Sequence, residues 1–384
     1  MKERRDIDAL YSLPKEVLYC KRCVVSNQRP RIVFDREGVC NACRWAERKH
    51  GNIDWRERER WLIDILSQHR RSDGRFDVIV PSSGGKDSAY VAHILKHKYA
   101  MHPLTVTWSP NVYTEIGRYN FHKMIDSGLD NVLGTPNGWV NRRLVRLCLE
   151  ELGEPFQPFI YGQYWFPVKA AIQYDVSLIM MGENAEIEYG GDPSTEDKFG
   201  FQIGEEIVYW FQHSGVERWL DRFTPQDLHH YMPPDLGIAA EKRVERHFMG
   251  YYRKWIPQEN FYYCAENIGF KPNPDGRSES TYSKYASLDD QFDGFHYYFM
   301  LLKFGIGRAT SDAAHEVRDG HITREEGVAL VRRYDAEKPS RYLREFLAYC
   351  GMSEREYWAV ADGWRNPRLW TMSENDWVLK QQVT

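Results

Sequence analysis

The sequence predicts an α/β protein in which a doubly wound parallel sheet follows an N-terminal four-cysteine module and precedes a helical C-terminal part. Short β-branched runs alternate with helical patterns between residues 76 and 182, which is typical of parallel strands joined by crossover helices. Two Cys-x-x-Cys pairs punctuate the N-terminal stretch, and helical patterns dominate from about residue 260. We therefore expect a cysteine module at 1–50, an α/β domain at 51–205, an aromatic insertion or lid at 206–259 and a helical region at 260–384.

The expected elements follow one another in a regular order. A helix begins after Asp54, because Trp55, Leu62, Ile65 and Leu66 share one stripe with charges opposite. Strands are expected at 76–80, 103–108, 130–135 and 176–182, with helices at 88–99, 117–128 and 139–152 between them. Ligands of such sheets bind at the carboxyl ends of the strands, so the loops after residues 80, 108, 135 and 182 should surround one crevice.

Composition limits the partners. The 51 Lys and Arg residues against 55 Asp and Glu give a net charge of −4, so no overall basic charge attracts a nucleic acid. We expect a small-molecule substrate and no nucleic-acid or membrane partner. The N-terminal stretch has no signal-peptide core and no apolar run is long enough to cross a bilayer, which favours a cytoplasmic location.

The stretch SSGGKDS at residues 82–88 joins an expected buried strand to an expected helix. It fails the Walker pattern, because Val80 stands where that pattern needs Gly and Asp87 where it needs Ser or Thr. The physical ingredients of an anion site remain, since backbone N–H groups of a small-residue turn point along a helix N-terminus beside Lys86. A Ser-Gly turn without a ligand is the simpler alternative.

The four N-terminal cysteines have the spacing of a metal site. Cys20 and Cys23 are separated from Cys40 and Cys43 by 16 residues, as in structural zinc sites with four thiolate ligands. An iron–sulfur cluster or a redox pair is the alternative. Three further cysteines lie outside any Cys-x-x-Cys pair and are expected to be small buried residues rather than ligands: Cys148, Cys264 and Cys350.

The loop and three longer segments carry a family resemblance. SSGGKDS resembles the pyrophosphate loop (PP-loop) of the ATP pyrophosphatase superfamily, whose fold is HUP-like (adenine nucleotide alpha hydrolase-like) and whose members cleave ATP between the α- and β-phosphates. With the cysteine segment at 20–46, YTEIGRYNF at 113–121, MGENAEIEYGG at 181–191 and the stretch 282–327, the chain resembles the N-acetyl sugar amidotransferases of bacterial surface-polysaccharide and nonulosonic-acid biosynthesis. The similarity spans about residues 18–335.

The resemblance implies that an acetamido group on a sugar, which is nucleotide-linked in the expected substrate, becomes an acetamidino group. Transfer of AMP to the amide oxygen makes a leaving group that ammonia can displace, and Mg²⁺ would neutralise the phosphates. No Gly-x-Cys-x-Gly glutaminase motif occurs around Cys148, Cys264 or Cys350, and residue 2 is lysine. We therefore expect ammonia from a separate histidine-biosynthesis-like glutaminase, with a cyclase-like subunit as a further candidate partner.

Residue roles follow from the loop and from the strand ends. The resemblance places Ser83, Gly84, Gly85, Lys86, Asp87 and Ser88 at the pyrophosphate, with Asp87 a candidate Mg²⁺ ligand or a helix N-cap. Gly182, Glu183 and Asn184 leave the fourth expected strand at the crevice and suit nucleotide, ammonia, metal or sugar binding, or form a simple turn. Glu188 follows in the same loop.

Other candidates have equally good structural explanations. Asp289 and Asp290 end a capping-box pattern that starts at Ser287, whereas Asp290, Asp293 and His296 recur along one helical side and could act together. Cations that could hold phosphate or carboxylate, or make surface pairs, are Lys303, Arg308 and Arg324. Trp108 and Tyr113 follow the second strand, where a ring could cover adenine or pack in the core.

Two rival functions remain from the sequence. A tRNA-thiolating enzyme has a similar loop and zinc module, but it typically carries further paired cysteines, which this chain lacks. A scaffold with a degenerate loop is the non-enzymatic alternative.

Overall fold

The structure is a computed structural model that describes residues 5–205, 207–211, 214–374 and 376–384. Its main sheet has the order β3-β2-β1-β4-β6-β5. All neighbours run parallel except β5 and β6. The strands are β1 (Val78–Pro81), β2 (Pro103–Trp108), β3 (Asp130–Gly134), β4 (Leu178–Met181), β5 (Gly200–Phe201) and β6 (Glu245–Phe248). The predicted α/β class and its four strands are confirmed.

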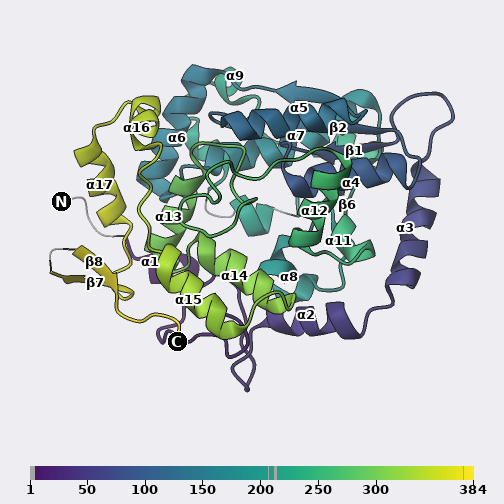
Figure 1. Cartoon of the computed structure of the whole chain (residues 1–384). Helices are drawn as coiled ribbons and strands as arrows, with labels where there is room; N and C mark the ends of the chain where they lie inside the picture. Colours follow the sequence, from purple (N-terminus) through teal and green to yellow (C-terminus); the bar gives the residue numbers. More distant parts are fainter. Residues whose placement is uncertain (1–4, 206, 212–213, 375) are drawn as a thin grey trace.

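Side chains alternate between the two faces of the sheet. Val78 and Val80 of β1 pack in one core with α3 (Trp55–His69), α4 (Lys86–His97), α5 (Glu115–Asp126), α11 (Met249–Tyr252) and α12 (Pro257–Asn267). Ile79 packs in the opposite core with α6 (Gly138–Leu152) and α7 (Gln157–Tyr174). Because period-two alternation buries both faces, the sheet is covered by helices on each side, as Figure 1 shows.

The strand order reverses at β1. From β1 the chain builds outward through β2 to β3, and β4 then pairs on the other side of β1. The carboxyl ends of β1 and β4 therefore flank the topological switch point, where open α/β sheets bind their ligands.

The sheet extends past residue 205, where the sequence places the end of the α/β domain. The segment 206–259, expected as an aromatic insertion or lid, supplies β6 and buries Trp219, Tyr231 and Trp255 in the cores. Residues 206, 212 and 213 lie outside the described residues. Short elements make up the rest of residues 185–241: α8 (Ala185–Tyr189), η1 (Pro193–Thr195), η2 (Ile207–Phe211), η3 (Val216–Trp219), α9 (Pro225–Leu228) and α10 (Leu236–Glu241).

The cysteine module shares its core with the C-terminal helices. It contains α1 (Ile7–Tyr11) and α2 (Asn41–Gly51), and its buried cysteines pack in one cluster with Phe295 and Phe299. The C-terminal helices are α13 (Asp293–Phe304), α14 (Arg308–Arg318), α15 (Arg324–Tyr334), α16 (Leu343–Cys350) and α17 (Glu354–Gly363), followed by the hairpin β7 (Trp370–Ser373) and β8 (Asp376–Leu379). The module therefore has no hydrophobic core separate from that of the C-terminal helices among the described residues.

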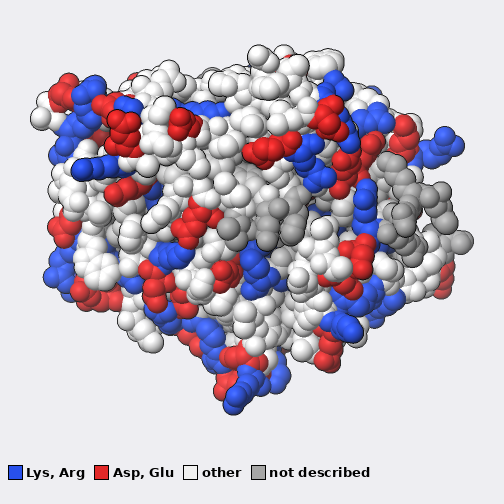
Figure 2. Space-filling model, turned by 180° about the vertical axis from the view of Figure 1, so that it is seen from behind, with Lys and Arg blue, Asp and Glu red and all other residues white. Residues whose placement is uncertain are grey.

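The surface and helix lengths bear on partners. On the face opposite to the view of Figure 1, acidic and basic side chains are intermingled (Figure 2), in keeping with the small net charge. Within the described ranges, no helix has the length and apolar character needed to span a bilayer.

Candidate functional site

The turn between β1 and α4 leaves backbone donors exposed at a helix start. Gly84 has φ +89°, and a Cβ there would lie 2.6 Å from the Cα of Phe121, so only glycine fits. Gly85 is the N-cap of α4 and gives no side-chain hydrogen bond to the first turn. The first N–H groups of this 12-residue helix therefore point, without a capping side chain, toward the switch point.

Neighbouring side chains hold the turn in place. The hydroxyls of Ser82 and Ser88 are hydrogen-bonded at 2.9 Å. Asp87 accepts from Asn260 Nδ2 at 3.0 Å and is ion-paired with Lys86. Cys264 donates its thiol to the Lys86 carbonyl at 3.1 Å and is buried. The turn is thus braced from α12 as well as from the sheet.

A cavity of about 500 Å³, the central cavity, opens at this turn. Its walls come from residues 81–83 and 85–88, from Val106 and Trp108 of β2, from residues 181–183 at the end of β4, from α7 and from the segment 285–297, whereas Gly84 does not line it. Three of the four predicted loops therefore converge. The loop after residue 135 does not line the cavity, because β3 is the edge strand and lies two strands from the switch point.

Trp108 forms one wall of the central cavity and also packs in the core. Its ring centroid lies 5.7 Å from that of Phe166, and only 5% of the residue is exposed. Gly162 makes room for it, since a Cβ there would come within 2.0 Å of the indole. Tyr113 instead forms an isolated antiparallel bridge with Asp290 and does not line this cavity.

Besides Asp87, four acidic side chains face the central cavity: Glu183, Asp289, Asp290 and Asp293. Burial, with the charge of Asp87, raises the pKa of Glu183 to about 7. Burial also raises the pKa of Asp289, against a hydrogen bond from Ser83 that lowers it, and raises the pKa of Asp290 to about 7. The Asp293 carboxylate makes no hydrogen bond or ion pair within the described part of the chain, and it lines the cavity. The carboxyl groups of Glu183 and Asp290, with pKa values of about 7, can exchange protons near neutral pH.

The acids converge by a different route from the one predicted. No capping box forms at Ser287, which has φ +55°, and α13 begins only at Asp293 after Phe292. Asp290 lies on the preceding loop, where its carboxylate accepts from the backbone N–H groups of Asn111 and Phe292. Shared position on one helical side therefore does not explain the cluster, and the bridge to Tyr113 does.

His296 and the predicted cations separate into two groups. His296 lines the central cavity, and its Nδ1 lies 2.7 Å from a carboxylate oxygen of Glu154. Burial lowers the pKa of His296, but the Glu154 carboxylate outweighs this effect, so that the pKa is raised overall. Arg308 lines the same cavity and bonds Asp312 at 3.2 Å. Lys303 and Arg324 lie elsewhere: Lys303 is buried 3.9 Å from Glu154, and Arg324 bonds the Cys20 carbonyl.

Two predicted residues after β4 have structural partners instead. Asn184 caps α8, accepting from Glu186 N at 3.1 Å and donating to the Thr195 carbonyl at 3.3 Å. Glu188 is buried and accepts from Trp45 and Lys49 of the cysteine module. Neither lines the central cavity, whereas Gly182 and Glu183 do.

A second cavity of about 400 Å³, the side cavity, adjoins the first. The two share Ser287, Leu288, Asp290, Asp293 and Tyr297. Its other walls combine apolar residues with polar side chains, including Thr114, Asn273, Ser278 and Arg341. A molecule in the side cavity would therefore contact a molecule in the central cavity across Asp293.

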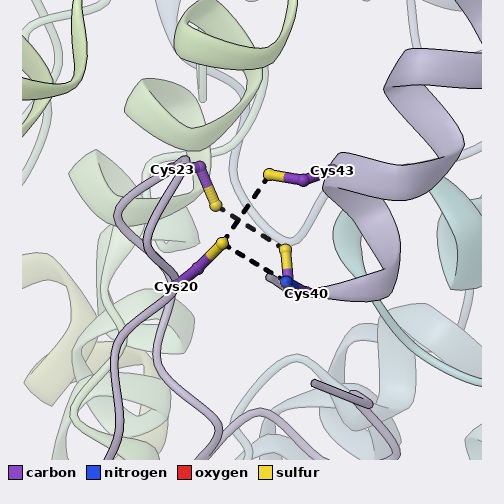
Figure 3. A group of neighbouring side chains, drawn as sticks. All are labelled: Cys20, Cys23, Cys40 and Cys43. Atoms are coloured by element: carbon purple, nitrogen blue, oxygen red, sulfur yellow. Dashed lines mark hydrogen bonds between the residues drawn. The ribbon is translucent and has the colours of Figure 1, made fainter. Parts of the chain in front are cut away.

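The four N-terminal cysteines form a closed cluster (Figure 3). Their sulfur atoms all lie within 4.8 Å of one another, with Cys20 to Cys43 at 3.8 Å and Cys23 to Cys40 at 3.7 Å. Four thiolates around one zinc at about 2.3 Å would be separated by about 3.8 Å. All four are buried and free of disulfides, so the donor set and spacing fit a tetrahedral metal ion.

Some lining residues were not selected from the sequence. The sequence explains Asp289 only as part of a helix start. In the structure its Oδ2 lies near the β1–α4 turn, 4.0 Å from where a Cβ on Gly85 would be. No local sequence motif marks Glu154, which is the partner of His296. The same holds for His315, which is buried behind the turn. The only available signal was chemical type, because all three act through contacts distant in sequence.

The fold and site thus define an α/β protein with a small-residue turn before a helix N-terminus at its switch point and a four-cysteine cluster that could hold a metal ion. Residues 279–384 match the family model described as the C-terminal domain of LPS biosynthesis protein WbpG-like proteins. This match supports the resemblance found in the sequence.

Other comparisons are more distant. The "Uncharacterized protein MJ1599" of Methanocaldococcus jannaschii is 27% identical over 88 residues, which are 23% of this chain and 31% of that protein. The chain thus spans about a third of the length of this curated relative.

Two solved structures are 14% identical. NMN synthetase from Francisella tularensis has a TM-score of 0.26, with 50% of this chain and 97% of that chain covered. The U34-tRNA thiolase NcsA from Methanococcus maripaludis, with its [4Fe-4S] cluster, has a TM-score of 0.30, with 83% and 87% covered. At these scores neither likeness carries an argument.

Proposed function

We propose that this protein is an ATP-dependent, AMP-forming amidotransferase that converts the acetamido group of an N-acetylated sugar into an acetamidino group for surface-polysaccharide biosynthesis. The observation that carries the proposal is the central cavity, where the uncapped start of α4 and Lys86 face a group of carboxyl side chains, and which joins the side cavity at Asp290 and Asp293. The match of residues 279–384 to a lipopolysaccharide-biosynthesis family supports the sugar as substrate class.

In this proposal the central cavity binds ATP. Its volume of about 500 Å³ lies within the range of ligand pockets, about 300–1,000 Å³. The first N–H groups of α4 and the Lys86 ammonium hold the β- and γ-phosphates, and Trp108 lies at the wall for the base. Asp87 and Asp289 supply the oxygen ligands that Mg²⁺ prefers, and that ion would neutralise phosphate charge during adenylyl transfer.

The side cavity binds the sugar. Its hydroxyl and amide side chains suit a polyhydroxylated molecule, and Arg341 suits a phosphate or carboxylate on it. Asp293 lies between the two cavities with no hydrogen-bond partner among the described residues, so it is placed to orient the acetamido N–H. Binding both reactants side by side in a fixed orientation makes a bimolecular step effectively unimolecular.

The reaction balances in two steps. The acetamido oxygen attacks the α-phosphorus and pyrophosphate leaves, which gives an O-adenylyl imidate. Ammonia then attacks the imidate carbon, AMP leaves with the former carbonyl oxygen, and the released proton passes to Glu183, whose pKa of about 7 suits it as a base. The product amidinium carries a positive charge beside Asp293 and Asp289, where carboxylates stabilise it.

The remaining cysteines favour this reaction over tRNA thiolation. Cys148, Cys264 and Cys350 are buried in three different core clusters, so they form no pair to carry sulfur. The cysteine cluster would hold a zinc ion with a structural role, because four protein ligands leave no open coordination position. Ammonia would come from a separate glutaminase, with a cyclase-like subunit as a second candidate partner.

One assay tests the proposal. The full chain is incubated with ATP, Mg²⁺, ammonium and nucleotide-linked N-acetyl sugars, and the products are measured by mass spectrometry. We expect AMP, pyrophosphate and a sugar lighter by about one mass unit. Lys86→Met should lower the rate at least about 100-fold, whereas Lys98→Met, at the exposed end of the same helix, should not. Formation of ADP, or of thiolated tRNA, would contradict the proposal.

A further inference from the structure

A third cavity lies behind the phosphate turn, on the side away from the sugar. It has a volume of about 60 Å³ and is called here the small polar cavity. Its inner end shares Lys86, Asp87 and Glu183 with the central cavity. Its outer end is formed by Gln258 at the start of α12 and by His321 after α14, and His321 is exposed. The cavity therefore joins the surface to the reacting end of Glu183.

The size of this cavity excludes every large reactant. A water-sized molecule occupies about 10–15 Å³ on the same measure, so the cavity holds a few such molecules and neither a nucleotide nor a sugar. It is also polar: its walls are lined by carboxyl, imidazole and hydroxyl groups. A small, hydrogen-bonding molecule is the ligand that fits.

His315 gives a second, independent reason to expect such a ligand. It lines the small polar cavity, only 7% of it is exposed, and neither of its ring nitrogens has a hydrogen-bond partner within the described residues. Unpaired buried nitrogens are costly. Burial and the charges of Arg318, Lys49, Lys86 and Arg308 hold its pKa well below the usual value, so the ring is neutral and offers one donor and one acceptor.

We propose that the small polar cavity is the passage through which ammonia reaches the adenylylated sugar, with His315 hydrogen-bonding ammonia on its way to Glu183. This inference rests on the proposed function. Neutral ammonia is the form that can attack carbon, and the neutral His315 ring can accept a hydrogen bond from it or donate one to it. The surface around Gln258 and His321 is then the docking face for the ammonia-producing subunit.

The outer end is closed by one hydrogen-bonded carboxylate. Glu316 accepts from Gln258 at 3.2 Å, from His321 at 2.8 Å and from the Tyr285 hydroxyl at 2.7 Å. Gln258 and His321 are side chains at the surface end, and their displacement by a docked partner would open the passage. The inner end needs no gate, because Glu183 already belongs to both cavities.

The test separates the two chemical steps. Isotope exchange between pyrophosphate and ATP, with sugar but without ammonia, measures adenylyl transfer alone. Amidino-sugar formation at varied ammonium concentration measures the second step. Gln258→Trp should raise the KM for ammonium at least tenfold and leave exchange within twofold. The matched control is Glu259→Trp, at the exposed neighbouring position of α12, which should change neither.

A second variant guards against a folding effect. His315→Leu keeps the approximate volume but removes both ring nitrogens, and it too should raise the KM for ammonium without altering exchange, with its melting temperature recorded alongside. If both variants keep the KM for ammonium of the unmodified protein, the passage is refuted while the proposed function stands. If the unmodified protein shows no exchange and no AMP, the proposed function fails and the passage with it.

Discussion

Replacement of Gly84 by alanine perturbs the phosphate turn at a defined point. An alanine there must adopt φ +89° and would place its Cβ 2.6 Å from the Phe121 Cα, whereas ordinary contacts begin at 3.4 Å. The left-handed backbone costs about 1–2 kcal/mol for a residue with a Cβ. Phe121 is buried in α5 and cannot retreat, so the turn itself must move by about 0.8 Å.

That displacement has a predictable size of effect. A misplacement of about 1 Å can cost about 100-fold in rate, so we expect Gly84→Ala to weaken ATP binding and ATP–pyrophosphate exchange about 30- to 100-fold. This corresponds to about 2–3 kcal/mol, at 1.4 kcal/mol for each tenfold change. ATP affinity is measured by isothermal titration calorimetry and stability by urea unfolding.

The matched control is Gly74→Ala. Gly74 also has positive φ, +79°, but a Cβ there meets nothing within 4 Å. It should lose about 1–2 kcal/mol of unfolding free energy and bind ATP as the unmodified protein does. The reasoning is refuted if Gly84→Ala binds ATP within twofold of Gly74→Ala, because the turn would then not be the phosphate site.

Two further predictions concern the metal and the base. The cysteine cluster shares its core with α13. Cys23→Ser should therefore abolish one bound zinc per chain, measured by atomic absorption, and lower the melting temperature of the whole protein by on the order of 10 °C. An unchanged melting curve would rule out a structural ion. Glu183, with its pKa raised to about 7 mainly by burial, is protonated below that pH and becomes a base above it. The ammonia step at constant free ammonia should therefore rise about tenfold between about pH 6 and 8, and Glu183→Gln should lower the rate and flatten the profile; a steep profile in that variant would assign the ionisation to another group.

Three of the predicted strands could be recognised because their own residues indicate that they are buried. β1, β2 and β4 are runs of apolar, often β-branched residues, as expected for parallel strands buried on both faces. β6 has the sequence ERHF and gave no such signal, yet Arg246 and His247 are only 2% and 1% exposed. Hydrogen bonds to the Tyr164 carbonyl and to the Tyr252 hydroxyl make this burial possible, and they join residues that sequence patterns cannot relate.

The candidate site likewise has one part that could be predicted from the sequence and one part that could not. The β1–α4 turn and the cysteine pairs are each continuous in sequence, so residue types and spacing were enough to predict a small-residue turn before a helix and a compact four-cysteine group. The acidic group at 289–293 depends on the pairing of Asp290 with Tyr113, which are far apart in the chain. Asn184 and Glu188 show the opposite error: a strand end at the crevice supplies polar residues both for ligands and for caps, and only the contacts distinguish the two uses.

The cysteine module also contacts the segments around Glu183 through buried ion pairs of Lys49. Lys49 of α2 contacts Glu188 and Asp319 at 3.1 Å each and donates to the Trp255 carbonyl at 3.0 Å. Glu188 belongs to the segment after β4, Asp319 directly follows α14 and Trp255 lies two residues before α12, and these three segments line the small polar cavity. Breaking a buried pair by removing one partner typically costs about 3–5 kcal/mol. In the proposed function, a metal ion that holds α2 in place would affect the reaction by keeping Glu183 in position, without itself binding substrate, because four thiolates complete its coordination.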